Sequence, residues 1–339
     1  SGASSNNKFY NNTIQNVNVG ICLSGFTAPS PYTLADTGND IGGTSGATGN
    51  TIINFGGGTG ATTACAAVFV KEQWSFNVSY NTVNNNNGSG VNHPNTNRGI
   101  FANASSIGAS ATINNNNVTI TGGTSTTAID WAIDCEMAQS GNASGNTISI
   151  NNNTVSITKT AASTVALTAI WVQSAPATMN INGNTITNFT YAGTSTSTTD
   201  VGVIRSGLAG IGTLNINNNT ISSVTTTGTT GAIFLIGSSG APTTAVNINN
   251  NAFNGLNTTG ATTKSVVGIS STAGGATVTT SISNNNFQGF THVGSGALTF
   301  ITCTGTPLNQ TVNSNTFTNL TIGGTGTITF INHGYTIPT

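Results

Sequence analysis

The sequence predicts an all-β solenoid in which one chain of 339 residues winds into about ten coils of about 34 residues each. Three observations support this fold class. A short Asn-rich motif recurs along the whole chain, a second motif keeps the same period, and apolar residues between them alternate with polar ones, as in a β-strand. Because both motifs continue from near the first residue to near the last, residues 1–339 are predicted to form a single domain.

The first motif is an asparagine, any residue, and then Ile, Val or Phe. In MNINGNTIT, Ile181 and Ile186 are five residues apart, so both point inward only if the chain turns between them. Asn tolerates the left-handed backbone region, and its amide bonds to nearby backbone. Stacked copies of this turn would bring the amides together in a ladder. The predicted ladder residues are Asn12, Asn50, Asn81, Asn116, Asn153, Asn184, Asn219, Asn251, Asn285 and Asn315.

The second motif is a small residue followed by a branched or aromatic one. β-Branched residues dominate around it, whereas Asn, Gly and Thr are poor in helix interiors, so the repeat units are strands. A single coil buries too few aliphatic side chains to offset the ordering of its backbone, so coils must stack. The motif occurs at Gly20-Ile21, Ala67-Val68, Gly99-Ile100, Ala132-Ile133, Ala169-Ile170, Gly202-Val203, Ala232-Ile233, Gly268-Ile269, Thr299-Phe300 and Thr329-Phe330.

The first coil is followed by a predicted insertion loop at residues 24–43, which holds two of the seven prolines. Asp36, Asn39 and Asp40 in this loop are hard oxygen ligands at a spacing that could hold calcium, the one cofactor the sequence suggests. A turn with Asp at its bends explains the same residues.

The four cysteines are too few for a disulfide scaffold. Cys22 and Cys65 lie in successive coils and form a candidate disulfide. Cys135 and Cys303 are predicted to be small, buried side chains.

Composition excludes two classes of partner. Only 4% of residues are charged and the net charge is -1, so no basic surface is available for nucleic acid. The longest apolar runs fall well short of the roughly 20 residues that span a bilayer, so membrane insertion is not expected. The sequence begins without an initiator Met or an apolar signal region, and we expect any export signal to have been removed or to lie outside this sequence.

Across residues 6–333, the pattern I-N-x-N-x-I followed by a small residue and Ile resembles the right-handed parallel β-helix of the pectin-lyase-like superfamily. The segment NDIGGTSGATGNTI, at residues 39–52, is similar to an element of bacterial surface β-helix repeats. The chain most resembles the Asn/Thr/Gly-rich repeat surface proteins of Bacteroidota-type bacteria. The resemblance implies right-handed winding and a secreted, extracellular or cell-surface location. It leaves activity open, because the superfamily contains lyases, hydrolases, adhesins and passive spacers.

Catalytic residues are not predicted. Hydrolysis needs at least two carboxylates around the scissile bond, and the only acidic cluster is Asp130, Asp134 and Glu136. Strand alternation would put all three on one side, as a catalytic or calcium site or as a solvated patch. The N-T-D, D-D, G-H-G and R-I-K motifs of polygalacturonase-like hydrolases are not intact, and NHG at residues 332–334 matches only partly. Arg98 and Arg205 have no acidic neighbours in the sequence, unlike the arginine base of pectate-lyase-like enzymes.

Other candidate ligand residues have simpler explanations. His93, His292 and His333 are far apart in the repeat and are expected at the surface or in turns. Trp74, Trp131 and Trp171 could stack on sugars, although aromatics in a solenoid more often fill the core or its rim.

An outward row of threonines is similar to the flat face of ice-binding solenoids, although Thr is also a good outward strand residue. The row is interrupted by Asn117, Ala252 and Asn286. Its members are Thr13, Thr51, Thr82, Thr154, Thr185, Thr220 and Thr316, with Thr187 and Thr318 completing T-x-T pairs.

Neither end of the sequence shows a recognisable cap for the sheet edges, and the low charge favours axial association. We therefore expect an extracellular, non-enzymatic structural protein, a subunit of a self-assembling filament or an adhesin stalk. Its partners would be further copies of itself, stacked head to tail, or neighbouring repeats of a larger surface protein. The alternative is a polysaccharide-binding or polysaccharide-cleaving β-helix, which carboxylates gathered in a groove would favour. Ice binding is a third, weaker hypothesis.

Overall fold

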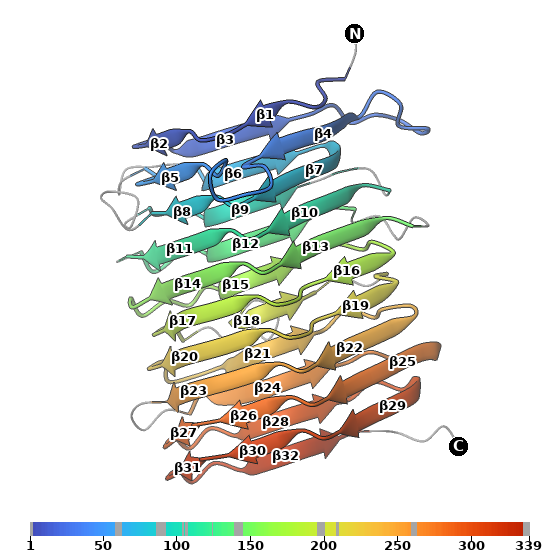
Figure 1. Cartoon of the computed structure of the whole chain (residues 1–339). Helices are drawn as coiled ribbons and strands as arrows, with labels where there is room; N and C mark the ends of the chain where they lie inside the picture. The colour runs from blue at the N-terminus through green and yellow to red at the C-terminus, as the bar shows by residue number, and fades with distance from the viewer. Residues whose placement is uncertain are drawn as a thin grey trace.

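The computed structural model describes residues 3–334 apart from 58–62, 86–92, 104, 106–107, 124, 139–144, 195–200, 208–209 and 259–262. In these residues the regular structure consists of strands, and no helix occurs. The chain forms a β-solenoid of three parallel sheets around one core (Figure 1), which confirms the predicted fold class. Each coil contributes a strand to sheet A, then one to sheet B, then one to sheet C.

Sheet A contains the strands that precede the Asn turn in each coil. They are β1 (Lys8–Phe9), β4 (Asp36–Ile41), β7 (Gln73–Ser79), β10 (Ser110–Asn114), β13 (Thr147–Asn151), β16 (Thr178–Asn180), β19 (Thr213–Asn215), β22 (Ala245–Asn249), β25 (Gly275–Ser283) and β29 (Pro307–Asn313).

Sheet B contains the strands that follow the Asn turn. They are β2 (Thr13–Gln15), β5 (Thr51–Ile53), β8 (Thr82–Asn84), β11 (Asn117–Gly122), β14 (Thr154–Lys159), β17 (Thr185–Tyr191), β20 (Thr220–Thr226), β23 (Ala252–Thr258), β26 (Asn286–Gln288) and β30 (Thr316–Thr318), joined by the short β27 (Thr291–His292) and β31 (Thr321–Ile322).

Sheet C contains the strands that carry the second motif. They are β3 (Val19–Ser24), β6 (Cys65–Lys71), β9 (Asn97–Asn103), β12 (Asp130–Glu136), β15 (Leu167–Val172), β18 (Val201–Ser206), β21 (Ala232–Ser238), β24 (Ser265–Ser271), β28 (Leu298–Cys303) and β32 (Ile328–His333).

The turn between sheets A and B is the same in nearly every coil. In nine of the ten coils the residue before the ladder asparagine has a left-handed φ, as in Asn152 (55°) and Gly183 (67°). The left-handed residue is therefore the one before the ladder asparagine rather than the ladder asparagine itself. This geometry turns the ladder side chain into the corner, where it is buried from Asn50 to Asn285.

The ten predicted asparagines form one hydrogen-bonded ladder. Nδ2 of Asn153 donates to Oδ1 of Asn184 at 3.0 Å, and the Asn153 backbone N–H donates to the same oxygen at 2.9 Å. Asn184 bonds to Asn219 in the same way. All nine steps from Asn12 to Asn315 have Nδ2 to Oδ1 distances of 2.9 or 3.0 Å. Each Nδ2 from Asn50 to Asn315 also donates to a backbone carbonyl, as Asn184 does to Ile150 O at 2.8 Å.

Sheet C strands place two consecutive residues in the core. Ala132 and Ile133 are both fully buried core residues, so the usual alternation of inward and outward side chains shifts by one residue at this point. Ile133 is in register with Ile100 and Ile170 in the neighbouring coils. The second motif therefore marks the two adjacent inward-facing residues of a sheet C strand.

The register of the second motif was predicted wrongly in four coils. The residues in register with Ala132-Ile133 are Val203-Ile204, Leu235-Ile236, Phe300-Ile301 and Phe330-Ile331, not the predicted pairs Gly202-Val203, Ala232-Ile233, Thr299-Phe300 and Thr329-Phe330. The position consists of two adjacent inward-facing residues, and the first of them is large and apolar in these four coils but Gly or Ala in the others.

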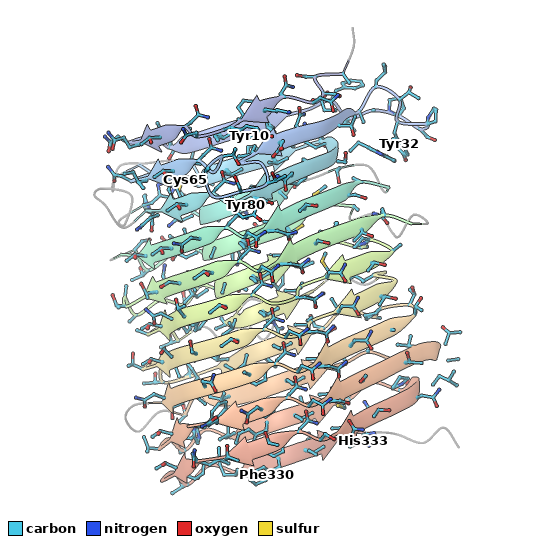
Figure 2. The ribbon with its side chains drawn as sticks, viewed as in Figure 1. Tyr10, Tyr32, Cys65, Tyr80, Phe330 and His333 are labelled. Atoms are coloured by element: carbon cyan, nitrogen blue, oxygen red, sulfur yellow. The ribbon has the colours of Figure 1, made fainter. Side chains whose placement is uncertain are left out.

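The predicted insertion at residues 24–43 is shorter than expected. Residues 36–41 are β4, a regular strand that pairs with β1 and β7, so the irregular segment is limited to residues 25–35. Within that segment, Tyr32 stacks on Trp74 of β7 with ring centroids 4.9 Å apart, and Figure 2 shows it near the N-terminal start of β4.

Candidate functional site

The outer face of sheet C differs from the outer faces of sheets A and B. In sheets A and B, buried and part-exposed residues alternate, as in β13 and β14. Every residue of β15 and β18 is buried, and in β12 only Glu136 is not. The middle of sheet C is therefore covered on both faces. Its outward side chains, unlike those of sheets A and B, are shielded from solvent.

Aromatic side chains stack along the solenoid axis on this outer face. Phe69 stacks on Phe101 with centroids 5.2 Å apart, and Trp131 stacks on Trp171 at 6.3 Å with nearly parallel rings. The parallel register produces the first contact, because Phe69 pairs with Phe101 across β6 and β9. Trp131 and Trp171 are not register partners, since Trp131 pairs with Thr168 and Trp171 with Asp134. The outward position that bears Asn, Thr or Ser in the other sheets is aromatic here.

Arg98 and Asp134 form an ion pair within this aromatic surface. Nε of Arg98 donates to Oδ2 of Asp134 at 2.5 Å. The guanidinium lies 4.0 Å from the centroid of Phe101 and 4.7 Å from that of Trp131, so it also makes cation–π contacts. The Arg98 side chain is 14% exposed and Asp134 is fully buried. We call Arg98, Phe101, Trp131, Asp134, Glu136 and Trp171 the sheet C cluster.

Burial changes the protonation of the two carboxyls in the sheet C cluster. It raises the pKa of Asp134 to about 7, an effect that the charge of Arg98 partly opposes. It also raises the pKa of Glu136, which is only partly buried. Two polar atoms of the cluster, Oδ1 of Asp134 and Nε1 of Trp131, are buried without a hydrogen-bond partner. These atoms could bond to a ligand or to an ordered water.

The predicted carboxylate cluster is divided between the two faces of sheet C. Because Ala132 and Ile133 both point inward, Asp130 lies inside the solenoid and Asp134 outside. Asp130 is bonded to Lys159 Nζ at 2.5 Å and to Asn97 Nδ2 at 3.2 Å. The expectation that all three carboxylates lie on one side is wrong, and neither aspartate belongs to a solvated patch, since both are buried and ion-paired.

Sequence spacing could not have identified the acidic partner of Arg98. Arg98 and Asp134 are 36 residues apart and meet only because β9 and β12 are adjacent in the sheet. A hollow adjoins Arg98 on this face, lined by Val19, Ala64, Ala66, Phe69 and Phe101.

The predicted calcium ligands lie in two separate hydrogen-bond groups. Asp36 and Asn39 are buried and both bond to Gln73, whereas Asp40 is half-buried and accepts the Tyr10 hydroxyl at 2.5 Å. Oδ1 of Asp40 also accepts bonds from the protein. Among the described residues, no three Asp, Glu, His or Cys side chains are grouped as metal ligands. Calcium binding stays a prediction without geometric support.

The predicted disulfide between Cys22 and Cys65 is wrong. Cys22 is in register with Phe69, four residues after Cys65, so the two Cα atoms are separated by roughly 13 Å along the strand direction. A disulfide needs Cα atoms within about 7 Å. Cys65 instead donates to Oδ1 of Asn97 at 3.3 Å, and burial raises the pKa of its thiol to about 12. All four cysteines are free, and Cys135 and Cys303 are buried as predicted.

Two of the three histidines are not at the surface. His292 is fully buried, with Nδ1 3.1 Å from Thr258 Oγ1 and Nε2 2.8 Å from Gly296 O. His93 is also buried, with Nδ1 3.1 Å from Gly57 O. His333 is exposed at the end of β32, as Figure 2 shows. His93 and His292 contact backbone carbonyls, and the expectation of a position at the surface or in a turn is wrong for His292, which is buried in β27. His93 lies outside the strands, although it is buried.

The predicted threonine row is in register along sheet B, but the column beside it is not threonine. Thr185 pairs with Thr154 and Thr220. The second column does not continue as threonine, because Thr318 pairs with Gln288. The neighbouring column of the T-x-T pairs is therefore not threonine in the described strands. A separate outward column further along sheet B is mostly threonine, with Thr121, Thr158, Thr190 and Thr225 in register.

Comparisons with protein-family models, with curated proteins and with solved structures gave no match. The β-solenoid is therefore established by the structure, and the attribution to the pectin-lyase-like superfamily and to Bacteroidota-type surface proteins stays a prediction. A search of the described residues for an apolar helix long enough to cross a bilayer found none.

Proposed function

We propose that the chain is an extracellular structural module, a stiff axial spacer that serves as a filament segment or an adhesin stalk. The observation that carries this proposal is the unbroken Asn ladder, which runs through all ten coils with nearly constant geometry. A ladder buried along one corner resists both bending and slippage of register, because each step shares two donors with one acceptor oxygen. Such a spacer needs no catalytic residues.

The ladder also has a direction. At every step the N-terminal asparagine donates through its backbone N–H and Nδ2, and the C-terminal asparagine accepts through Oδ1, as Asn219 and Asn251 do. Further coils, from the same polypeptide or from another copy, can extend this ladder only head to tail. In the described structure the strands of the first and last coils are paired on one side only. The low charge of the chain offers little repulsion to such axial association.

Electron microscopy of the purified protein tests this proposal. Head-to-tail association predicts filaments with an axial repeat of roughly 48 Å, or ten coils at about 4.8 Å each. Phe330 is 47% exposed on the last coil, so Phe330→Lys should abolish the filaments. The matched control Thr154→Lys, on the exposed side of sheet B, should leave them intact. Monomers at every concentration in the unmodified protein would contradict self-assembly.

The sheet C cluster supports a second candidate function, polysaccharide binding. Aromatic rings, an arginine and a carboxyl together can stack on a sugar ring and bond to its hydroxyls. The specific observation is that Asp134 Oδ1, an acceptor when ionised, and Trp131 Nε1, a donor, both lack partners. A hydroxyl group can satisfy both kinds of atom, although both are buried, so this function requires that the residues covering them move aside to admit the sugar.

Retention on insoluble polysaccharides tests this second function. If the cluster binds sugar, Asp134→Asn and Trp171→Ala should release the protein from the polysaccharide that retains it. Trp74→Ala, which removes a tryptophan of sheet A, is the control and should bind normally. Equal binding by all variants would place any sugar site elsewhere.

A further inference from the structure

Lys159 and Asp130 meet inside the corner between sheets B and C. Lys159 ends β14 and reaches back to Asp130 at the start of β12, in the preceding coil. The two side chains are 0% and 2% exposed. The pair therefore links two successive coils in a region closed to solvent.

The hydrogen bonds around this pair hold Nζ of Lys159 close to Cγ of Asp130. Lys159 Nζ is 2.5 Å from Oδ2 of Asp130, so it lies within about 3.7 Å of Cγ, one C–O bond further on. Nζ also donates to Ala128 O at 2.7 Å, and Asn97 Nδ2 donates to the other carboxyl oxygen, Oδ1, at 3.2 Å.

Gly122 makes this approach possible. A Cβ at Gly122 would lie 2.6 Å from Oδ2 of Asp130 and 3.3 Å from Cγ of Lys159. Only glycine leaves room at this position for the carboxyl group beside the lysine chain.

The dry surroundings favour the neutral form of the Asp130 carboxyl. Burial raises the pKa of Asp130, although the charge of Lys159 partly opposes the effect. Transfer of a proton from the ammonium to the carboxylate produces an amine and a carboxylic acid, which avoids the cost of two buried charges. Held in contact, such a pair has the high effective concentration of an intramolecular reaction.

We propose that Lys159 and Asp130 are joined by an amide bond between Nζ and Cγ, formed by condensation with loss of one water molecule. The Nζ lone pair attacks Cγ, and the Cγ–Oδ2 bond breaks. Oδ2 leaves as water with the carboxylic acid proton and one proton from Nζ. Oδ1 stays as the amide oxygen and keeps its hydrogen bond from Asn97. The step involves no oxidation or reduction and needs no co-reactant.

The cross-link would fix two coils to one another in the middle of the stack. It closes the chain between residues 130 and 159 covalently, which limits the unfolded ensemble as a disulfide does. This inference does not depend on the proposed structural function, since a cross-link can form in any solenoid with this corner.

Intact-mass spectrometry of the denatured protein tests the proposal. The expected mass is that of the 339-residue sequence less one water molecule, and digestion should give a branched peptide that joins residues 130 and 159. Lys159→Arg and Asp130→Ala should each have the full sequence mass. Lys264→Arg, at the other fully buried lysine, is the matched control and should keep the loss.

Either of two results would overturn the proposal. One is a full sequence mass for the unmodified protein, with residues 130 and 159 in separate peptides, as an ordinary ion pair requires. The other is a water loss that persists in Lys159→Arg, which would place it elsewhere in the chain. The measurement on the unmodified protein decides the question even if a variant fails to fold.

Discussion

The two corners of the solenoid on either side of sheet B are built by different means. The corner between sheets A and B uses a ladder asparagine in every coil, preceded by a left-handed residue in nine of the ten coils. The corner between sheets B and C uses a different buried side chain in different coils. Lys159 donates to Ala128 O, Tyr191 donates to Val165 O at 2.7 Å, and His292 contacts Gly296 O.

This difference follows from the lengths of the connecting segments. The A–B turn is short in all coils but the second, where residues 42–50 separate β4 from β5, so the ladder asparagines meet at the start of each sheet B strand and can bond to one another along the axis. The B–C connections vary in length, so each backbone carbonyl there is fixed by whichever polar side chain reaches it. The first corner therefore specifies the stack, and the second fixes individual loops.

The largest loss of stability is expected when the asparagine ladder is broken. Asn184→Ala removes the acceptor for Asn153 N–H and Nδ2 and the donor to Ile150 O, all buried. Unsatisfied buried groups cost about 1–3 kcal/mol each, so the free energy of unfolding should fall by at least about 3 kcal/mol. Chemical denaturation measures this loss.

Asn254→Ala is the control for the ladder variant. Asn254 is exposed on the outer face of β23 and should change stability by no more than about 0.5 kcal/mol. Equal losses in the two variants would mean that the ladder does not differ from surface asparagines.

A smaller loss is expected when the inward pair of sheet C is overpacked. A Cβ at Gly99 would lie 2.4 Å from Ala132 O and 2.6 Å from Cγ1 of Val118. Gly99→Val should therefore lower the midpoint of thermal unfolding, by the equivalent of about 1–3 kcal/mol. Gly46→Ala, where the added Cβ meets nothing within 4 Å, should be nearly neutral. A neutral Gly99→Val would show that the close contact between sheets B and C is not required.

A substitution in the corner between sheets B and C should destabilise only the neighbouring backbone. Tyr191→Phe removes the hydroxyl that donates to Val165 O and should cost about 1 kcal/mol. Hydrogen exchange should rise near residue 165 and stay unchanged at the ladder. Faster exchange at Asn184 in this variant would show that the two corners are not independent.

The outer face of sheet C should add a shallow dependence of stability on pH. Burial raises the pKa of Asp134 from 3.8 to about 7, so between these values the folded protein holds a proton that the unfolded chain has lost. The free energy of unfolding should therefore fall as the pH rises from about 4 to about 7. Asp134→Asn should remove this part of the slope in denaturation curves measured across that range. An identical slope in the variant would contradict the raised pKa.

The sequence predicted the features that depend on local chemistry. All ten ladder asparagines and the parallel strand architecture were identified, because the A–B turn repeats within a few residues. Features that depend on register across coils were missed. The shift at Ala132-Ile133 put Asp130 and Asp134 on opposite faces, and the register of β3 with β6 separated Cys22 from Cys65.

The most direct test of the ladder is native-state hydrogen exchange of the asparagine side-chain amides, followed by NMR. A ladder that specifies the stack predicts that the Nδ2 protons of Asn153, Asn184 and Asn219 exchange only through global unfolding, as slowly as the core backbone amides. Exchange of these protons at the rate of an exposed asparagine such as Asn254 would contradict the account.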